Sequence, residues 1–251
     1  MAGTPELDTS GQVPECILLA GAHGGVGAAL AQTFCARFPQ ATLLTISRQD
    51  IPALSSTHQH LQIALDDPGN VPDIQDWLLR APLPNWVVNC CGTLHWREHR
   101  PEKSLRECDD RAMQHSFSIN ALTHLHLAQA LDPLLKRRTP LTWASLSAKV
   151  GSIEDNQLGG WYSYRMSKAA LNMLIRNLSI EWGRKLDVCR VVAIHPGTTD
   201  TPLSKPFQAN LPEGKLFTPE LSASRIADVI QNLSDDDNGK LLFWDGSVIP
   251  W

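Results

Sequence analysis

The sequence predicts an α/β fold in which helices cover both faces of one doubly wound parallel sheet, giving a single domain of three layers. Two observations support this prediction: short continuous apolar runs recur along the chain, and segments with helical spacing separate them. A strand covered on both faces is apolar at consecutive positions, so such runs are typical of a buried parallel sheet. Strands that alternate with helices join through right-handed crossovers, which produce a doubly wound sheet.

The predicted elements follow these patterns in chain order. Strands are expected at the apolar runs 16–20, 41–46, 61–65, 86–88, 141–144, 191–194 and 241–244. Helices are expected at 26–38, 70–80, 110–137, 159–185 and 219–234. Residues 1–14 are rich in Gly, Pro, Thr and Ser and are predicted to be a flexible tail, which leaves 15–251 as the domain. We find no internal repeat and no boundary within it.

Composition limits the classes of function. The chain has 251 residues, 43% of them apolar, and a net charge of −4, which gives no electrostatic reason to expect nucleic acid as a partner. The basic run 136–138 is interpreted as the C-terminal end of a helix. No secretory signal or membrane-spanning run is predicted, and the six cysteines lack paired metal spacing. Reduced thiols in the cytoplasm fit this pattern best.

Two motifs far apart in the chain carry chemistry. The first is the glycine-rich turn 21–27, which follows a predicted strand and opens a predicted helix. Glycines accept positive φ and leave backbone N–H groups uncovered, so such a turn lets phosphates approach a helix N-terminus. The second is Tyr164 with Lys168, four residues apart and so on one face of a helix, where the ammonium favours the phenolate. The pair of motifs predicts hydride transfer.

A third string competes with this interpretation. Residues 95–99 spell His-x-x-Glu-His, a zinc signature, but zinc needs both histidines on one helix face and a further ligand. The string follows a predicted strand and leads into Arg100-Pro101, which favours a loop, so no metal is expected. His124 and His126 are two residues apart, on different helix faces, and are interpreted as surface or packing residues.

From about Cys16 to Trp251 the chain resembles a short-chain dehydrogenase/reductase of the single-domain Rossmann type. Within that family it is most similar to the carbonyl-reductase-like branch that includes the sniffer and C-factor proteins. The strings that carry this closer resemblance are Gly151-Ser152-Ile153, residues 159–165, Trp244-Asp245-Gly246 and Ile249-Pro250-Trp251.

The resemblance implies a set of cofactor-binding residues. Gly21, Gly25 and Gly27 match the family's glycine turn, and Asp66 matches its adenine-binding aspartate. The other implied contacts are Asn89, Gly92, Tyr164, Lys168, Pro196, Gly197, Thr199 and Thr201. Ser47-Arg48 end the second strand where a protein preferring NAD carries a carboxylate. Because a guanidinium suits a 2′-phosphate, with His23 as a further donor, NADP(H) is predicted over NAD(H).

The resemblance also implies the catalytic residues. Tyr164 is expected to exchange the proton, Lys168 to supply positive charge and hold the nicotinamide ribose, and Asn120 to retain a water for proton relay. The family's second serine of Ser-Ser-x-x-Gly, which polarises the substrate carbonyl, is absent, because position 148 is alanine. Ser147 is the favoured replacement and Ser152 the second candidate, while a purely structural role for both serines stays open.

The sequence therefore predicts an NADP(H)-dependent oxidoreductase that acts on a small carbonyl or alcohol, with a substrate lid near 202–217. The alternative is a signalling or scaffold protein that binds the cofactor on the same fold with little turnover. A homodimer or homotetramer is expected from the family, with the long helices as its faces.

Overall fold

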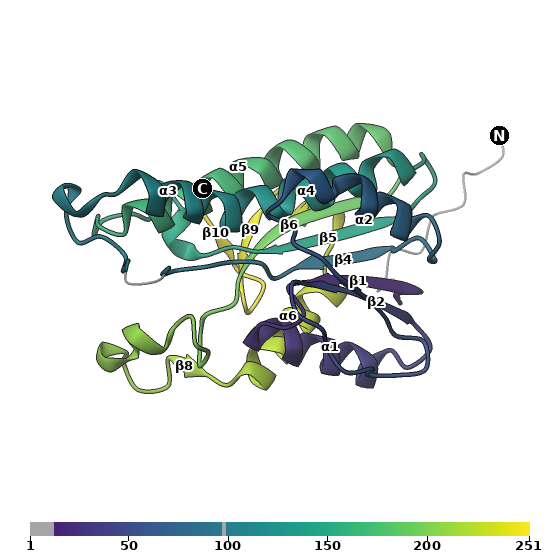
Figure 1. The fold of residues 1–251 in the computed structure, drawn as a ribbon, viewed down its shortest axis with the longest axis horizontal. Coiled ribbons are helices and arrows are strands. Elements are labelled where there is room, and N and C mark those ends of the chain that lie inside the picture. Colours follow the sequence, from purple (N-terminus) through teal and green to yellow (C-terminus); the bar gives the residue numbers. More distant parts are fainter. Residues whose placement is uncertain (1–12, 97–98) are drawn as a thin grey trace.

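One mostly parallel sheet forms the centre of the computed structural model, which describes residues 13–96 and 99–251 (Figure 1). Its strands are β1 (Cys16–Ala20), β2 (Thr42–Ser47), β3 (Gln59–Gln62), β4 (Trp86–Asn89), β5 (Leu141–Leu146), β6 (Cys189–His195), β9 (Leu241–Phe243) and β10 (Val248–Ile249). Their order across the sheet is β3-β2-β1-β4-β5-β6-β9-β10, and only β10 runs antiparallel to its neighbour among these described strands. The predicted fold class is confirmed.

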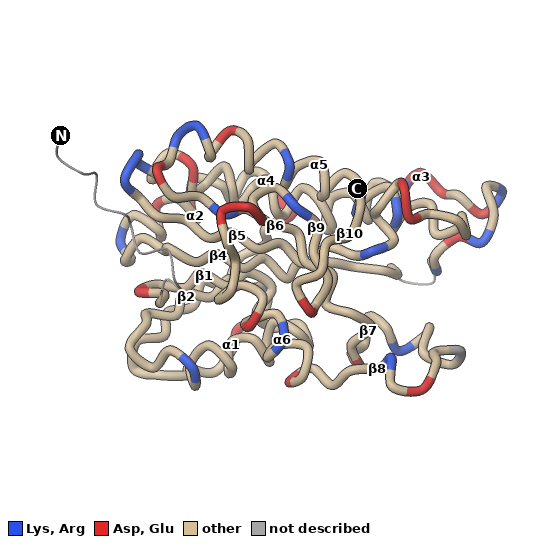
Figure 2. The backbone as a smooth tube through the Cα atoms, turned by 180° about the vertical axis from the view of Figure 1, so that it is seen from behind, with Lys and Arg blue, Asp and Glu red and all other residues tan. Residues whose placement is uncertain are grey.

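Helices cover both faces of this sheet (Figure 1). One layer holds α1 (Gly25–Arg37) and α6 (Pro219–Gln231), and the other holds α2 (Val71–Leu78), α3 (Asp110–Phe117), α4 (Thr123–Leu131) and α5 (Tyr162–Lys185). Alternate residues of β1 enter two separate cores, with Ile17 beneath α1 and Leu18 beneath α4 and α5. Both faces of each central strand are therefore buried, which explains the continuous apolar runs. Figure 2 shows the charged residues concentrated in helices and loops around an almost uncharged sheet.

Several elements differ from the sequence prediction. Strand β3 spans 59–62 rather than 61–65, because this edge strand is half exposed and its polar residues hide the pattern. The predicted helix 110–137 is helical as far as Leu134, but it winds as a π-helix over Ser118–Leu122 and ends in a 3₁₀ turn at Asp132–Leu134. The two-residue strand β10 was not predicted.

The segment predicted as a lid lies below the carboxyl end of the sheet (Figure 1). Two short parallel strands, β7 (Thr198–Thr199) and β8 (Leu216–Phe217), frame it, and a 3₁₀ helix spans Lys205–Asn210 between them. Within the described ranges, no helix has the length and apolarity needed to cross a membrane.

Candidate active site

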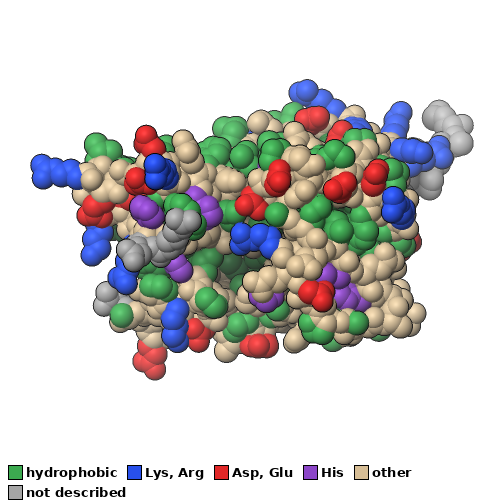
Figure 3. Space-filling model, viewed as in Figure 1, with side chains coloured by type: hydrophobic (Ala, Val, Ile, Leu, Met, Phe, Trp, Pro, Cys, Tyr) green, Lys and Arg blue, Asp and Glu red, His purple; other side chains and the backbone are tan. Residues whose placement is uncertain are grey.

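A cleft of about 240 Å³ lies at the carboxyl ends of β1, β2 and β4. The strand order reverses between β1 and β4, and ligands of open α/β sheets bind at such a switch point. Six predicted site residues line the cleft: Gly21, His23, Ser47, Arg48, Asp66 and Gly92. Figure 3 shows a hollow with a hydrophobic floor on this side of the molecule, with histidine and basic side chains near its rim.

The glycine turn leaves the N-terminus of α1 open. Gly21 has φ +76°, a left-handed conformation that suits glycine, and its N–H donates to the carbonyl oxygen of Ile46 at 2.9 Å. Helix α1 has no side-chain cap and no acidic residue in its first turn. Its first N–H groups and the positive end of its dipole are therefore available to a phosphate.

Thr201 lies directly against this turn. A Cβ placed on Gly25 would lie 2.6 Å from Cγ2 of Thr201, so only glycine fits there. Gly27, the third residue of α1, packs still more closely on the carbonyl oxygen of Gly21. Gly25, in the turn after β1, and Thr201, in the loop after β6, are 176 residues apart in the chain, and the two segments form one wall of the site.

The end of β2 carries the groups predicted to bind the 2′ position of the cofactor's adenosine ribose. Arg48 is exposed, and Ser47 is buried with its hydroxyl donating to the carbonyl oxygen of Gln49. Asp66 lines the same cleft from the segment after β3. No carboxylate occupies the end of β2 itself, so a guanidinium is the charged group at this point.

Asn89 and Asn120 shape the loop after β4. The Asn89 Oδ1 accepts the N–H of Cys91 at 2.9 Å, which makes this residue a turn former. Asn120 binds both backbone groups of Thr93: its Oδ1 accepts the N–H at 2.7 Å and its Nδ2 donates to the carbonyl at 2.9 Å. Asn120 lies within the π-helical turn, a feature that is frequent at functional sites.

Tyr164 and Lys168 lie on successive turns of α5, with the Lys168 Nζ 6.0 Å from the centre of the Tyr164 ring. Nζ also donates to the carbonyl oxygen of Leu146 at 2.8 Å. A Cβ on Gly92 would lie 3.4 Å from both this Nζ and the Oδ1 of Asn120, so the loop after β4 brings these groups together. The structure places three of the four predicted catalytic residues, Tyr164, Lys168 and Asn120, around one point.

Burial changes the acidity of both groups. It lowers the pKa of Lys168 from its ordinary 10.5 to about 8, with a small opposing effect of the nearby Cys91 and Cys90 thiols. Burial raises the pKa of the Tyr164 phenol above its usual range. Because the pKa of Lys168 remains above 7, its ammonium is present at neutral pH beside the phenol.

The two candidate serines have different surroundings. The buried Ser147 hydroxyl donates to Oδ1 of Asn172 at 2.6 Å, and the Asn172 Nδ2 is buried without a partner in the described structure. Asn172 lies one turn after Lys168 on α5. The buried Ser152 accepts the N–H of Asp155 at 3.1 Å and holds the loop that follows. To donate to a substrate, Ser147 would have to give up its hydrogen bond to Asn172, whereas Ser152 would donate while still accepting the N–H of Asp155.

The loop after β6 has an aromatic support. Gly197 has so little room that a Cβ would lie 2.5 Å from the Phe217 ring and 3.1 Å from that of Trp244. The guanidinium of Arg225 stacks on both rings, at 4.3 and 3.9 Å from their centres.

Thr199 is buried in the same loop, and its hydroxyl lies 2.7 Å from that of Ser222 on α6. Because the hydroxyl is already paired, only the backbone of Thr199 is available to a cofactor. Pro196 precedes Gly197 in the same loop.

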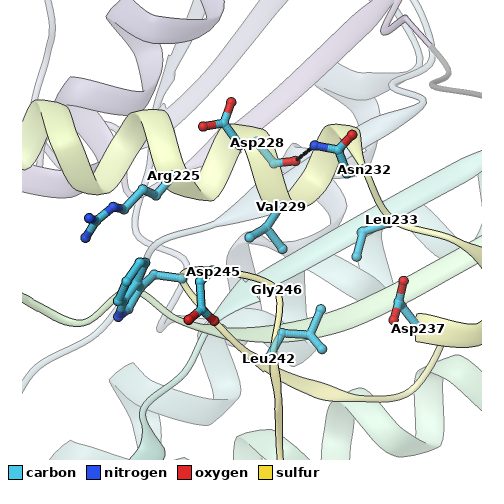
Figure 4. Close-up of a pocket in the computed structure, with 10 residues that line it drawn as sticks. Arg225, Asp228, Val229, Asn232, Leu233, Asp237, Leu242, Asp245 and Gly246 are labelled. Carbon is cyan, nitrogen blue, oxygen red and sulfur yellow. Dashed lines mark hydrogen bonds between the residues drawn. The ribbon is translucent and has the colours of Figure 1, made fainter.

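A second pocket, of about 290 Å³, lies between α6 and the turn from β9 to β10 (Figure 4). None of the predicted site residues lines it. Its acidic groups are already bound, since Asp228 pairs with Arg37 and Asp237 pairs with Ser234 and Lys240. The pocket borders the aromatic support of Gly197. Its third carboxylate, Asp245, accepts hydrogen bonds from Ser247, whereas the buried Nη1 of Arg225 has no hydrogen-bond partner among the described residues.

The histidines differ from the sequence interpretation. His124 and His126 are both buried, so a surface location is wrong and a packing role is right. His124 contacts Ser145 and Cys91, and His126 contacts the carbonyl oxygen of Leu65 at 2.7 Å. Within the zinc-like string, Arg97 and Glu98 lie outside the described residues. Nowhere in the described ranges do three His, Cys, Asp or Glu side chains gather as metal ligands do.

A glycine turn at a switch point, with a Tyr-Lys pair and an asparagine beside it, defines a dinucleotide-fold oxidoreductase. A family model described as enoyl-(acyl carrier protein) reductase matches residues 21–237, and the chain belongs to the short-chain dehydrogenase/reductase family. The predicted family is confirmed.

Two relatives show how far this similarity extends. This chain is 34% identical to 1-hydroxy-2-glutathionyl-2-methyl-3-butene dehydrogenase of Rhodococcus sp. (strain AD45). The match covers 139 residues, which are 55% of this chain and 58% of the relative. The chain is also 34% identical to C-signal of Myxococcus xanthus, over 148 residues that are 59% of this chain and 84% of the relative. The match therefore spans little more than half of the first relative.

Solved structures share the fold. An NADPH-bound carbonyl reductase from chicken fatty liver superposes with a TM-score of 0.80 at 24% identity, covering 96% of this chain and 100% of that one. The carbonyl reductase Sniffer of Drosophila melanogaster superposes with a TM-score of 0.77 at 22% identity, covering 94% and 99%. At these identities the similarity establishes the architecture alone.

Proposed function

We propose that this protein is an NADP(H)-dependent oxidoreductase that reduces a small carbonyl substrate or oxidises the matching alcohol. The observation that carries the proposal is the buried Lys168 ammonium beside the Tyr164 phenol, with Asn120 and Gly92 completing the site. Of these residues, Gly92 lines the cleft, whose glycine turn and open helix N-terminus suit a pyrophosphate. A nicotinamide cofactor supplies or accepts the hydride when bound.

The protein's own groups handle the proton. Tyr164 donates its phenolic proton to the forming alkoxide and takes a proton from the alcohol in the reverse direction. Lys168 is assigned to stabilise the phenolate through its positive charge, while burial acts in the opposite direction by raising the pKa of the phenol. Asn120 fixes the loop after β4 through Thr93 and is assigned the water of the proton relay. Ser147 is assigned the donor to the substrate carbonyl.

Preference for NADP(H) is supported by the end of β2. Arg48 is an exposed guanidinium on the cleft, and Ser47 precedes it, where a carboxylate would favour NAD. Guanidinium and phosphate pair in a bidentate manner, so Arg48 suits a 2′-phosphate. The structure of the chicken carbonyl reductase, which has NADPH bound, agrees with this choice.

A homodimer and a cytoplasmic location complete the proposal. Met166, Met173 and Ile180 recur every seven residues on α5 with exposed side chains, and such a stripe suits a second copy of the chain. All six cysteines are free, as is usual in a reducing compartment.

One experiment separates the enzyme from the scaffold alternative. The chain has two tyrosines, Tyr162 and Tyr164, so Tyr162→Phe is a matched control for Tyr164→Phe. A set of aldehydes, diketones and quinones is offered with NADPH, and loss of nicotinamide absorbance is followed. Under the proposal Tyr164→Phe loses turnover but binds NADPH, whereas Tyr162→Phe keeps both. Absence of turnover by the parent over the whole set would favour the scaffold reading.

A further inference from the structure

The turn that enters the catalytic helix has an unusual backbone. Gly159, Gly160 and Trp161 have φ values of +64°, +64° and +52°, three consecutive residues in the left-handed region. Trp161 is the one residue other than glycine with positive φ among those described. Its Cβ makes this conformation unfavourable, and strain of this kind persists only where surrounding contacts enforce it.

Contacts on several sides enforce it here. The N–H of Trp161 donates to the backbone carbonyl of Glu102 at 2.5 Å, and Arg165 Nε donates to the carbonyl of Gly160 at 3.1 Å. The buried Glu102 carboxylate also accepts both the N–H and the hydroxyl of Ser163 in the first turn of α5. The loop around Glu102 thus fixes Trp161 and the start of the catalytic helix together.

This backbone directs the Trp161 ring between Tyr164 and the lid. Its centre lies 6.2 Å from that of the Tyr164 ring and 5.4 Å from that of Phe207 in the lid. Phe207 in turn lies 6.3 Å from the ring of His95, whose Nε2 is 3.3 Å from the carbonyl oxygen of Pro202. The lid therefore meets the opposite wall at Trp161 and at His95, and the first of these contacts is one helical turn from the proposed proton donor.

We propose that Trp161 is a specificity-determining residue: with Phe207 it holds the lid over Tyr164 and limits the size of the group that a substrate carries beside its carbonyl. The strained conformation is what places the ring there, since a right-handed residue at 161 would direct its side chain elsewhere. The part of this inference that concerns turnover rests on the proposed function, whereas the contact that holds the lid does not.

The first experiment needs no substrate and measures how fast trypsin cleaves the lid, a rate that rises when the lid is no longer fixed by Trp161. Lys215 is exposed at the end of the lid, whereas Lys205 precedes proline and resists trypsin. Trp161→Gly is the variant of choice, because glycine accepts the left-handed backbone. We expect tryptic cleavage after Lys215, followed by mass spectrometry, to accelerate at least five-fold in Trp161→Gly and in Phe207→Ala. The double variant should cleave no faster than either single variant, because one contact is removed in all three.

Leu158→Ala is the matched control, since it removes an exposed apolar side chain from the same loop, and it should cleave at the parental rate. Parental cleavage in Trp161→Gly, or fully additive effects in the double variant, would show that Trp161 does not hold the lid through Phe207. Trp161→Phe should restore most of the protection, because it keeps an aromatic ring at this place.

The second experiment compares kcat/KM for a small aliphatic aldehyde and a bulky ketone. Trp161→Gly should raise the ratio of bulky to small substrate at least five-fold while the dissociation constant for NADPH stays parental. An unchanged ratio in variants of an active parent overturns the specificity role. A parent that binds NADPH but reduces neither compound contradicts the proposed function instead, and the cleavage experiment still decides the contact.

Discussion

The Nε2 of His124 lies 3.1 Å from the carbonyl oxygen of Cys91, and the direction of this hydrogen bond follows from its neighbours. Trp143 Nε1 can only donate, and it donates to the Ser145 hydroxyl oxygen at 2.9 Å. Ser145 therefore gives its own proton to Nδ1 of His124, also at 2.9 Å, which leaves the ring proton on Nε2 for Cys91. Burial, and then the charge of Lys168, lowers the pKa of His124 to about 3, so it stays a neutral bridge to the loop that lines the cleft.

Replacement of this bridge should weaken both the fold and cofactor binding. His124→Leu leaves the Ser145 hydroxyl proton and the Cys91 carbonyl oxygen without a partner, which costs about 3 kcal/mol of unfolding free energy, measured in urea. Because the loop it holds lines the cleft, the dissociation constant for NADPH should rise at least five-fold. Trp143→Phe removes only the far end of the chain of bonds and should destabilise without changing that constant. If His124→Leu binds NADPH as tightly as the parent does, the bridge contributes to stability alone and not to cofactor binding.

Lys168 should make the cofactor-free protein more stable as pH rises from 8 toward 10.5. Its pKa is lowered in the folded state, so between these values the unfolded chain binds more protons and alkali favours folding. The contribution is lost as pH falls through 8. Relative to Lys168→Met, the parent should gain about 2 kcal/mol of unfolding free energy between pH 8 and 9.5. A difference between the two proteins that does not vary with pH would contradict the lowered pKa.

The strands and motifs that the sequence predicted share one property: each is set by local pattern. The run 16–20 is buried on both faces, and the glycine turn and the Tyr164–Lys168 pair need only their own spacing. Three features could not be predicted because distant contacts determine them. His124 is buried by Ser145 and Cys91, and Trp161 is held left-handed by Glu102. The helix 159–185 was predicted to open at its glycines, but these form the left-handed turn, and α5 begins at Tyr162.

Arg48 should account for most of the preference for NADPH. A charge-assisted hydrogen bond is worth about 1.5–3 kcal/mol, so the parent should bind NADPH roughly 10- to 150-fold more tightly than NADH. Arg48→Ala should remove most of this difference and leave the dissociation constant for NADH within two-fold of the parent. Equal constants for the two cofactors in the parent would reject the assignment, and both are measured by titration of nicotinamide fluorescence.

The contact between Gly25 and Thr201 predicts a compensating pair. Gly25→Ala places a Cβ 2.6 Å from Cγ2 of Thr201, and relief of such an overlap by movement costs about 1–3 kcal/mol. Thr201→Ser removes that methyl group and keeps the hydroxyl, so the double variant should recover at least half of the loss in unfolding free energy. Strictly additive effects would mean that the two residues do not meet in solution.

Ser147 is the serine whose replacement should reduce turnover. Its proton now serves the Asn172 Oδ1, but the Asn172 Nδ2 has no partner among the described residues. A half-turn of this amide lets Nδ2 donate to Ser147 Oγ and frees the hydroxyl proton for a substrate carbonyl. The Ser152 oxygen accepts the N–H of Asp155 and so stabilises the loop that follows β5, to which this serine belongs.

Ser147→Ala should therefore lower kcat by about 10²–10³, the usual effect of losing a donor to a developing oxyanion, while Ser152→Ala stays within a few-fold of the parent. Ala148→Ser, made in the Ser147→Ala background, should recover part of the rate, because it restores a hydroxyl where the family carries one. Both single variants need NADPH dissociation constants at the parental level, so that the loss belongs to the chemical step. A near-parental rate in Ser147→Ala together with a large loss in Ser152→Ala would transfer the role to Ser152.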